Sequence, residues 1–273
     1  MCNIFPDTVL FNILSFVSIS VFFVNCSLYY VHMGLLFLDT ETTGNVPGKD
    51  RLCSVCYKLE DKVVNEFFNP PIPISIDAMA THHITQEMVT DKPAFEGSAT
   101  QKELEELLPE HVLVAHNAPF DIAMLESEGL TVPQYICTYR VARHMDSEGK
   151  IPRFSLQYLR YLLKLNVEGV IAHDAMGDVL VLEQLFKRML AKMVVKEETE
   201  DNAITKMIEL SQMPVLLPTM QFGKHKGKPF REVAERDSSY LRWLLEQKQQ
   251  DKAMGKLESN DEDLLYTLEH YLK

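Results

Sequence analysis

The chain has 273 residues, 46% of them hydrophobic and 24% charged, with a formal net charge of −12 at pH 7. This length allows one catalytic domain and a small second domain. Five cysteines, an odd number, argue against a disulfide framework. The acidic balance excludes a protein that coats nucleic acid through its overall charge. This composition is typical of a cytoplasmic enzyme, and we expect that localisation.

Residues 1–32 differ in composition from the rest of the chain. No charged residue occurs between Thr8 and Tyr30, and a stretch of this length could cross a bilayer. A signal peptide is a second interpretation, but no Lys or Arg precedes the apolar run. We favour a leader read from a start codon upstream of Met33, which directly precedes the first expected strand. No membrane partner is expected unless residues 1–32 form a genuine anchor.

The first expected strand, residues 35–38, is followed by two carboxylates. Asp39 and Glu41 stand two residues apart, and the side chains of a strand return to the same face every second residue. Like charges held this close in an apolar setting are unfavourable unless a cation lies between them. The pair therefore predicts a divalent metal site, against the alternative of a solvated strand face.

Alternating and apolar segments predict further strands and helices along the chain. We expect strands at 51–59, 62–69, 112–115 and 135–138, and helices around 100–108, after Asp121, and near 139–145, 155–163 and 175–193. This pattern predicts an α/β fold, a mixed five-stranded sheet flanked by helices.

Domain boundaries follow from the same pattern. Residues 33–194 are expected to form the larger, catalytic domain. The charged segment 195–213 is expected to be a linker helix, and residues 214–273 a small C-terminal domain.

Two later segments supply further candidate ligands. Asp121 follows the expected strand at 112–115, and Asp178 lies near the start of an apolar helix, five residues after His173. Taken alone, Asp121 could be a helix cap and Asp178 a first-turn charge favoured by the helix dipole. Four carboxylates together suit Mg²⁺ or Mn²⁺ rather than zinc. Two such ions about 3.5–4 Å apart can stabilise both oxygens of a phosphoryl transfer, and His173 suits deprotonation of the attacking water.

The combined set resembles a known group of enzymes. Its members are Asp39, Glu41, Asp121, His173 and Asp178. They match the defining residues of the DEDDh 3′-5′ exonucleases, in the DnaQ-like, ribonuclease-H-like superfamily. Residues 76–85 also match, with His83 standing where the family usually has glycine. The resemblance implies a ribonuclease-H-like fold and two Mg²⁺ or Mn²⁺ ions held by the four carboxylates. It also implies hydrolysis of the 3′-terminal phosphodiester, with release of 5′-mononucleotides.

The C-terminal part resembles the module that follows the exonuclease domain in exodeoxyribonuclease X-like proteins, through residues 222–228 and 233–244. DNA is therefore the expected substrate, at single-stranded or frayed ends, in DNA repair or proofreading. One alternative is a 3′-5′ exoribonuclease or small-oligonucleotide hydrolase. Another is a proofreading or adaptor subunit that binds a polymerase or repair protein. The intact catalytic set argues against a purely noncatalytic role.

Several further residues are candidate contacts to the substrate in the catalytic domain. By analogy with the family, Thr42 and Phe120 are expected to contact the terminal nucleotide. His116 and Asn117 are expected to fix their loop or to contact substrate rather than to bind metal.

In the C-terminal part, Lys224, Lys226 and Lys228 form a basic turn without an acid inside it. The turn could contact substrate phosphates or could be a solvated surface loop, and both interpretations stay open. Tyr240 and Trp243, three apart on an expected helix, are more typical of a core than of a base-stacking platform.

Overall fold

The computed structural model describes residues 34–146, 149–167, 175–256 and 261–273. The expectations for residues 1–32 and for His173 therefore lie outside the described residues. Within these ranges no helix is both long and apolar enough to cross a membrane.

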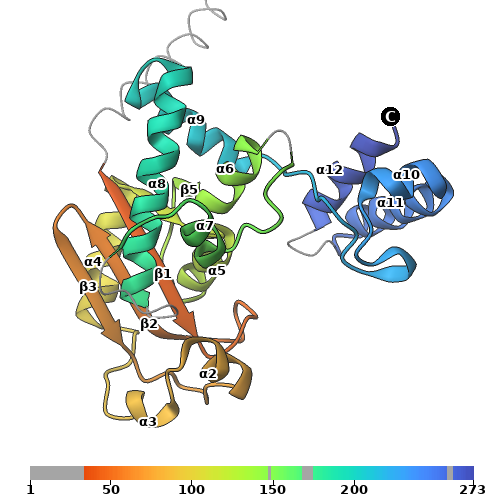
Figure 1. Cartoon of the computed structure of the whole chain (residues 1–273). Helices are drawn as coiled ribbons and strands as arrows, with labels where there is room; N and C mark the ends of the chain where they lie inside the picture. The colour runs from red at the N-terminus through yellow and green to blue at the C-terminus, as the bar shows by residue number, and fades with distance from the viewer. Residues whose placement is uncertain (1–33, 147–148, 168–174, 257–260) are drawn as a thin grey trace, which may run out of the picture.

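One sheet of five strands forms the centre of the larger domain (Figure 1). The strands are β1 (Leu35–Thr42), β2 (Leu52–Leu59), β3 (Lys62–Phe67), β4 (Val112–Ala115) and β5 (Tyr135–Cys137). Their order is β3-β2-β1-β4-β5. The pairs β1–β2 and β2–β3 are antiparallel, whereas β1–β4 and β4–β5 are parallel. The expected mixed five-stranded sheet is confirmed, and β1 is its middle strand.

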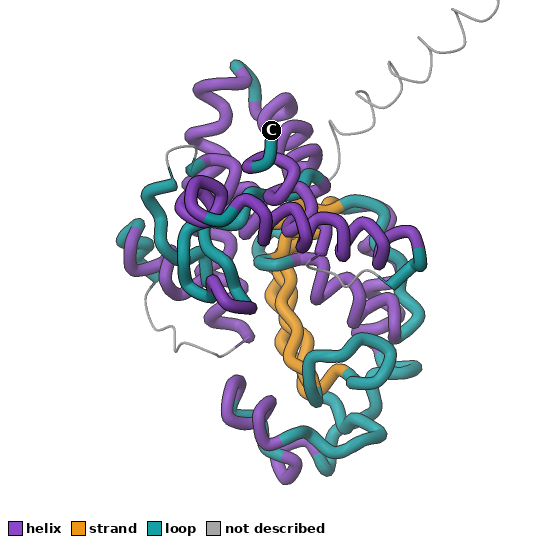
Figure 2. The backbone as a smooth tube through the Cα atoms, turned by 90° about the vertical axis from the view of Figure 1, so that its right-hand side faces the viewer, coloured by secondary structure: helices purple, strands orange, loops and turns teal. Residues whose placement is uncertain are grey.

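Helices lie on both sides of this sheet, which Figure 2 shows nearly edge-on as a narrow band. The helices of this domain are α2 (Ile76–His82), α3 (Gln86–Val89), α4 (Ala99–Glu110), α5 (Ala118–Ser127), α6 (Thr138–Met145), α7 (Leu156–Leu162), α8 (Ala175–Glu197) and α9 (Glu200–Gln212). Of these, α2 and α3 lie beyond one end of the strands (Figure 1). Residues of α4 and α5 pack on one face of the sheet, and residues of α6 to α9 pack on the other.

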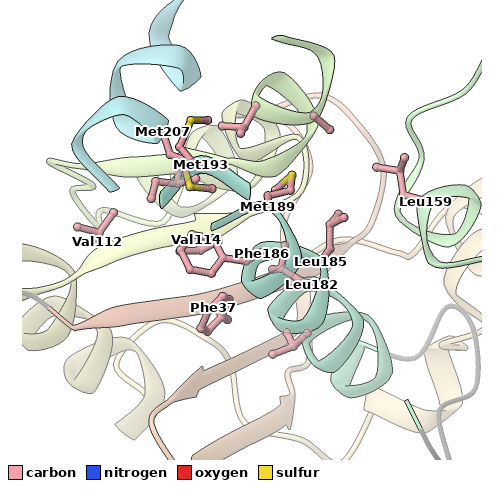
Figure 3. Packing of buried hydrophobic residues seen from close by; sticks show 14 of the residues in the cluster. Phe37, Val112, Val114, Leu159, Leu182, Leu185, Phe186, Met189, Met193 and Met207 are labelled. Carbon is pink, nitrogen blue, oxygen red and sulfur yellow. The ribbon is translucent and has the colours of Figure 1, made fainter. Parts of the chain in front are cut away.

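Alternation along β1 explains why both faces are covered. Leu36 and Leu38 are fully buried against the α4–α5 side, whereas Phe37 is buried against the α8 side. Phe37 meets Phe186 of α8 edge to face, with ring centroids 5.4 Å apart (Figure 3). Burying an aromatic side chain of this kind stabilises the fold by about 1.5–3 kcal/mol. The long helix α8 is thereby fixed against the middle strand.

The segment 195–213 differs from the expected linker helix. Helix α8 continues to Glu197, and after a left-handed residue, Glu198 at φ 70°, a new helix begins as α9. Ala203 and Met207 of α9 are fully buried in the same core as α8. The segment is therefore part of the larger domain, because a narrow apolar stripe suffices to pack an otherwise charged helix.

The C-terminal module has a core of its own. Its elements are the 3₁₀ turn η2 (Gly223–His225) and the helices α10 (Phe230–Arg236), α11 (Ser238–Ala253) and α12 (Asp261–Tyr271). They enclose buried side chains that include Phe230, Leu241 and Leu268. Arg140 of α6 connects this module to the larger domain, since its guanidinium lies 3.7 Å from the carboxylate of Asp263 on α12.

We expect Phe186→Ala to lower the free energy of unfolding by about 3–5 kcal/mol, because it removes a buried ring and leaves a cavity beside Phe37. Denaturant titration followed by circular dichroism would measure the loss. Tyr161→Ala is the matched control, since Tyr161 is 70% exposed, and it should cost no more than about 0.5 kcal/mol. Similar losses in both variants would contradict the role of the Phe37–Phe186 contact.

Candidate active site

Two of the expected carboxylates stand near the carboxyl end of the middle strand. Asp39 and Glu41 of β1 are half-buried and alternate with the buried Leu38 and Thr40. Because β1 and β4 run parallel, their carboxyl ends meet at one edge of the sheet. The residues that follow β4 are therefore delivered beside this acidic pair.

Asp121 reaches the same edge from α5. The helix begins at Ala118, three residues earlier than expected, because Pro119 fits the first turn of a helix, where no backbone donor is needed. Asp121 is only 3% exposed. One of its carboxylate oxygens accepts hydrogen bonds from the backbone N–H of Thr40 at 3.2 Å and from its hydroxyl at 2.8 Å. Thr40 therefore fixes Asp121 against the acidic strand.

Asp178 lies in the first turn of α8. Gln157 of α7 donates a side-chain hydrogen bond to the Asp178 carboxylate. The position of α8 is set further along by Phe186 and by Glu183, whose carboxylate is 2.8 Å from the Lys58 ammonium on β2. Gln157 was missed by sequence reasoning, because no motif surrounds it and only the packing of α7 on α8 reveals its contact.

The carboxylates interact electrostatically. Burial raises the pKa of Asp39 well above its ordinary value, and the charges of Asp121, Glu41 and Asp178 raise it further. Burial likewise raises the pKa of Asp121 to about 7, although the hydrogen bonds from Thr40 act in the opposite direction. The structure thus brings Asp121, Glu41 and Asp178, from three separate segments, close enough for their charges to act on Asp39.

This donor set fits a hard divalent cation. Carboxylate oxygens are the ligands that Mg²⁺ and Mn²⁺ prefer, and a cation would offset the repulsion among the acids. In the described part of the chain, no group of three or more His, Cys, Asp or Glu side chains already surrounds a metal-sized centre.

Thr42 is buried where β1 ends. Its hydroxyl donates to the carbonyl of Gly44 at 2.5 Å, and its own carbonyl lies 3.1 Å from Nε2 of His82. Nδ1 of His82 accepts from the backbone N–H of Ile84 at 3.0 Å. Burial lowers the pKa of His82, so the ring is neutral and carries its proton on Nε2, which donates to Thr42. Helix α2 is thereby attached to the acidic edge.

His83 has an unusual backbone conformation. It follows α2 in the left-handed region, at φ 62°, and its N–H bonds to the carbonyl of Met79. Glycine reaches this conformation without a Cβ clash.

His116 is held by the protein through both ring nitrogens. Nε2 lies 2.7 Å from the carbonyl of Phe154, and Nδ1 lies 2.9 Å from the hydroxyl of Thr138. Burial lowers the pKa of His116 to about 4, so the ring is neutral near pH 7. Of the two roles left open for His116, this geometry favours fixing the loop between β4 and α5.

The remaining candidate contacts fall into two places. Asn117 is exposed in a left-handed conformation before α5, and Phe120 is half-buried. Lys224, Lys226 and Lys228 lie in the C-terminal module, to one side of the domain that carries the carboxylates (Figure 1). The structure therefore does not bring the lysines into the carboxylate cluster.

Comparison with known proteins agrees with this site. A family model described as "Exonuclease" matches residues 36–186, which include Asp39, Glu41, Asp121 and Asp178. The chain belongs to this exonuclease family. It is a hydrolytic exonuclease with a DnaQ-like fold, as its sequence predicted, and enzymes of this family generally depend on divalent metal ions. A second model, "Exodeoxyribonuclease X-like C-terminal", matches residues 220–249.

Curated relatives cover most of the chain. Exodeoxyribonuclease 10 of Escherichia coli strain K12 is 34% identical over 250 residues, which are 88% of this chain and 99% of that protein. The DNA polymerase III subunit epsilon of Rickettsia prowazekii strain Madrid E is 28% identical over 218 residues, or 70% of this chain and 93% of that subunit.

Two solved structures of exonucleases are similar to this chain. The zinc-bound complex of E. coli ExoI with single-stranded DNA matches with a TM-score of 0.50 and 19% identity, over 64% of this chain and 43% of that one. Exonuclease X in complex with 5′ overhanging duplex DNA is 27% identical, with a TM-score of 0.48, and the match covers 65% of this chain and 99% of that one.

The acidic site generates a pH prediction for the metal-free protein. A carboxyl whose pKa is raised on folding binds more protons folded than unfolded, so the free energy of unfolding falls as pH rises. For Asp121 this loss develops between its ordinary value, 3.8, and about 7. Asp121→Asn keeps an acceptor oxygen for Thr40. Because the amide does not titrate, this variant should not lose stability as the pH rises.

In EDTA we therefore expect the Tm of Asp121→Asn to exceed that of the unmutated protein by more at about pH 8 than at about pH 5. Differential scanning fluorimetry at the two pH values measures this. The exposed Asp91 supplies the matched control, Asp91→Asn, which should show the same difference at both. A pH-independent effect of Asp121→Asn would show that burial does not perturb this carboxyl.

Proposed function

We propose that this protein hydrolyses the 3′-terminal phosphodiester of DNA, working in the 3′-5′ direction and releasing 5′-mononucleotides. The observation that carries the proposal is the cluster of carboxylates around the half-buried Asp39 and the buried Asp121, in which the charges of Asp121, Glu41 and Asp178 raise the pKa of Asp39. Such a cluster is costly to the fold unless it serves to bind cations. Its position at the carboxyl ends of parallel strands leaves it at an edge that a polymer end can reach.

In this mechanism Asp39, Glu41, Asp121 and Asp178 hold two Mg²⁺ or Mn²⁺ ions. When bound, the ions stabilise the charge that develops on the reacting phosphoryl group. Thr40 keeps one oxygen of Asp121 occupied and so sets the direction of the other.

Gln157 restricts the rotation of Asp178 in the same way. His173, five residues before Asp178, takes the proton from the attacking water. Thr42, Asn117 and Phe120 contact the terminal nucleotide.

DNA is the proposed substrate because the similarity to a protein named exodeoxyribonuclease extends over 88% of this chain, including the C-terminal module. A single-stranded or frayed end suits a site that must admit the last phosphate of a strand. We place the activity in DNA repair or proofreading in the cytoplasm. The residues proposed for catalysis come from the domain at 33–194.

RNA or short oligonucleotides are the alternative substrate, and the 2′-hydroxyl is the group that distinguishes them. An association with a polymerase is the second alternative, favoured by the 28% identity to DNA polymerase III epsilon subunits. In that case hydrolysis would serve proofreading within a larger assembly.

The first test incubates the protein with 5′-labelled single-stranded DNA, or with RNA of the same sequence, in Mg²⁺ or in EDTA. We expect a metal-dependent ladder that shortens from the 3′ end, with DNA degraded faster. Asp178→Asn should lower the rate by at least about a hundredfold, as loss of a group that stabilises transition-state charge does. The control Asp91→Asn should leave the rate unchanged. Faster shortening of RNA would reverse the substrate assignment, and no shortening of either polymer would refute the nuclease.

A second prediction concerns Gln157. Partners that orient a metal ligand typically contribute about 10–100-fold to activity or metal affinity, so Gln157→Leu should reduce the rate by about that factor. The concentration of Mn²⁺ needed for half-maximal rate should rise at the same time. Gln249→Leu, at an exposed position of α11, is the matched control. An unchanged rate and metal requirement in Gln157→Leu would show that Asp178 needs no orienting partner.

A further inference from the structure

The C-terminal module exposes aromatic side chains, one of which, Trp243, was expected in its core. Tyr240 packs at the edge of the module's core, as expected. Trp243, however, is 53% exposed on α11, and Phe222, just before the lysine turn, is 42% exposed. Large apolar side chains exposed close together often mark a binding site.

Contacts connect these aromatics to the lysine turn. The ring centroids of Tyr240 and Trp243 are 5.6 Å apart, with the planes inclined at 36°. The ammonium of Lys224 lies 4.9 Å from the centre of the Tyr240 ring. Gly223 comes so close that a Cβ there would lie 2.2 Å from the Tyr240 hydroxyl oxygen. The turn and the two rings therefore form one continuous area.

The turn is held in place by the backbone. The N–H of Met220 donates to the carbonyl of Lys228 at 2.9 Å, and the N–H of Gly227 donates to the carbonyl of Met220 at 2.8 Å. Asp237, at the start of α11, then binds both Lys224 at 2.7 Å and His225 at 2.9 Å. A surface ordered before binding loses less conformational entropy when a ligand arrives.

The charges of the turn are not equivalent. Lys224 is neutralised by Asp237, an acid that precedes α11 and lies outside the basic segment of the sequence. Lys226 and Lys228 are exposed, and neither has an ion-pair partner among the residues that the structure describes. Arg242, next to Trp243, is exposed as well. The area thus combines outward cations with an exposed indole in a chain whose net charge is −12.

This combination fits a single-stranded nucleic acid. Unpaired bases stack on aromatic rings irrespective of sequence, while cations follow the phosphates. A duplex would keep its bases covered, and an acidic peptide would leave the indole without a planar partner. The area defined by Phe222, Lys226, Lys228, Tyr240 and Trp243 is called the stacking surface below.

We propose that the stacking surface binds single-stranded DNA, with a base on Trp243 and phosphates at Lys226 and Lys228. The identity of the strand as DNA rests on the proposed function. The C-terminal module then supplies the substrate affinity that the acidic catalytic domain lacks. Binding at this surface does not require the metal ions of the carboxylate site.

Trp243 is the sole tryptophan of the chain, so its fluorescence reports on this surface directly. The full chain would be titrated with oligothymidylate in EDTA, where hydrolysis is prevented. We expect the emission to be quenched to saturation. Lys226→Gln/Lys228→Gln should weaken binding and reduce the slope of log K against log salt by about 1.4, since each phosphate contact to a single strand contributes about 0.7. Lys252→Gln/Lys256→Gln, with the same charge change at exposed positions near the end of α11, should leave both unchanged.

Anisotropy of a labelled oligonucleotide tests the ring itself. Trp243→Ala should weaken binding about 5- to 150-fold, as loss of one base–aromatic stack does. Tyr266→Ala, which removes a 39% exposed aromatic from α12, is the matched control and should bind normally. Absence of quenching, or equal losses in the two variants, would overturn the proposal. So would a concentration-dependent blue shift without DNA, which would show that a second copy of the chain covers Trp243.

The two proposals fail differently. Asp178→Asn should bind oligothymidylate as the unmutated protein does, because Asp178 lies in the other domain. Quenching by DNA without any hydrolysis in Mg²⁺ would overturn the exonuclease alone. Hydrolysis of short oligonucleotides without quenching would overturn the stacking surface alone.

Discussion

Repulsion among carboxylates at the end of β1 is the constraint on which the rest of the structure depends. The charges of Asp121, Glu41 and Asp178 raise the cost of ionising the half-buried Asp39, and burial raises the cost of ionising Asp121. Side chains in this situation would separate if the backbone allowed it. Their proximity therefore has to be imposed by helices and strands whose own packing is stable. The larger domain is organised in a way that does this.

Strand β1 and helices α5 and α8 hold the carboxylates near one another. The middle strand is fixed by apolar side chains on both faces, and Thr40 extends this order to Asp121 through two hydrogen bonds. The long helix α8 is fixed at Phe186 and Glu183, which places Asp178 at its free end. The acids therefore stand at the ends of elements that are fixed by apolar packing and ion pairs further along the chain.

Much of this could be predicted from the sequence, because local patterns encode it. The apolar runs of β1 and β4 predict these strands, and spacing predicts that Asp39 and Glu41 share a face. Contacts between distant segments were not predictable. Gln157 meets Asp178 only because α7 packs on α8. The α9 segment has a charged composition that conceals three fully buried residues, Ala203, Met207 and Ser211. In both cases the outcome depends on which helices pack against each other. The hydrophobic periodicity of the sequence does not reveal this.

The net charge of the whole chain is a poor guide to the charge at the stacking surface. At physiological salt a charge acts over about 8 Å in solution, so acids elsewhere in the chain scarcely affect a phosphate near Lys226 or Lys228. The fold also redistributes charge within that range, since Asp237 neutralises Lys224 and leaves the other two lysines outward. An acidic protein can in this way present a locally cationic, aromatic area. Separating that area from the carboxylates also keeps the lysines from competing with metal ions for the same acids, which a single mixed site could not avoid.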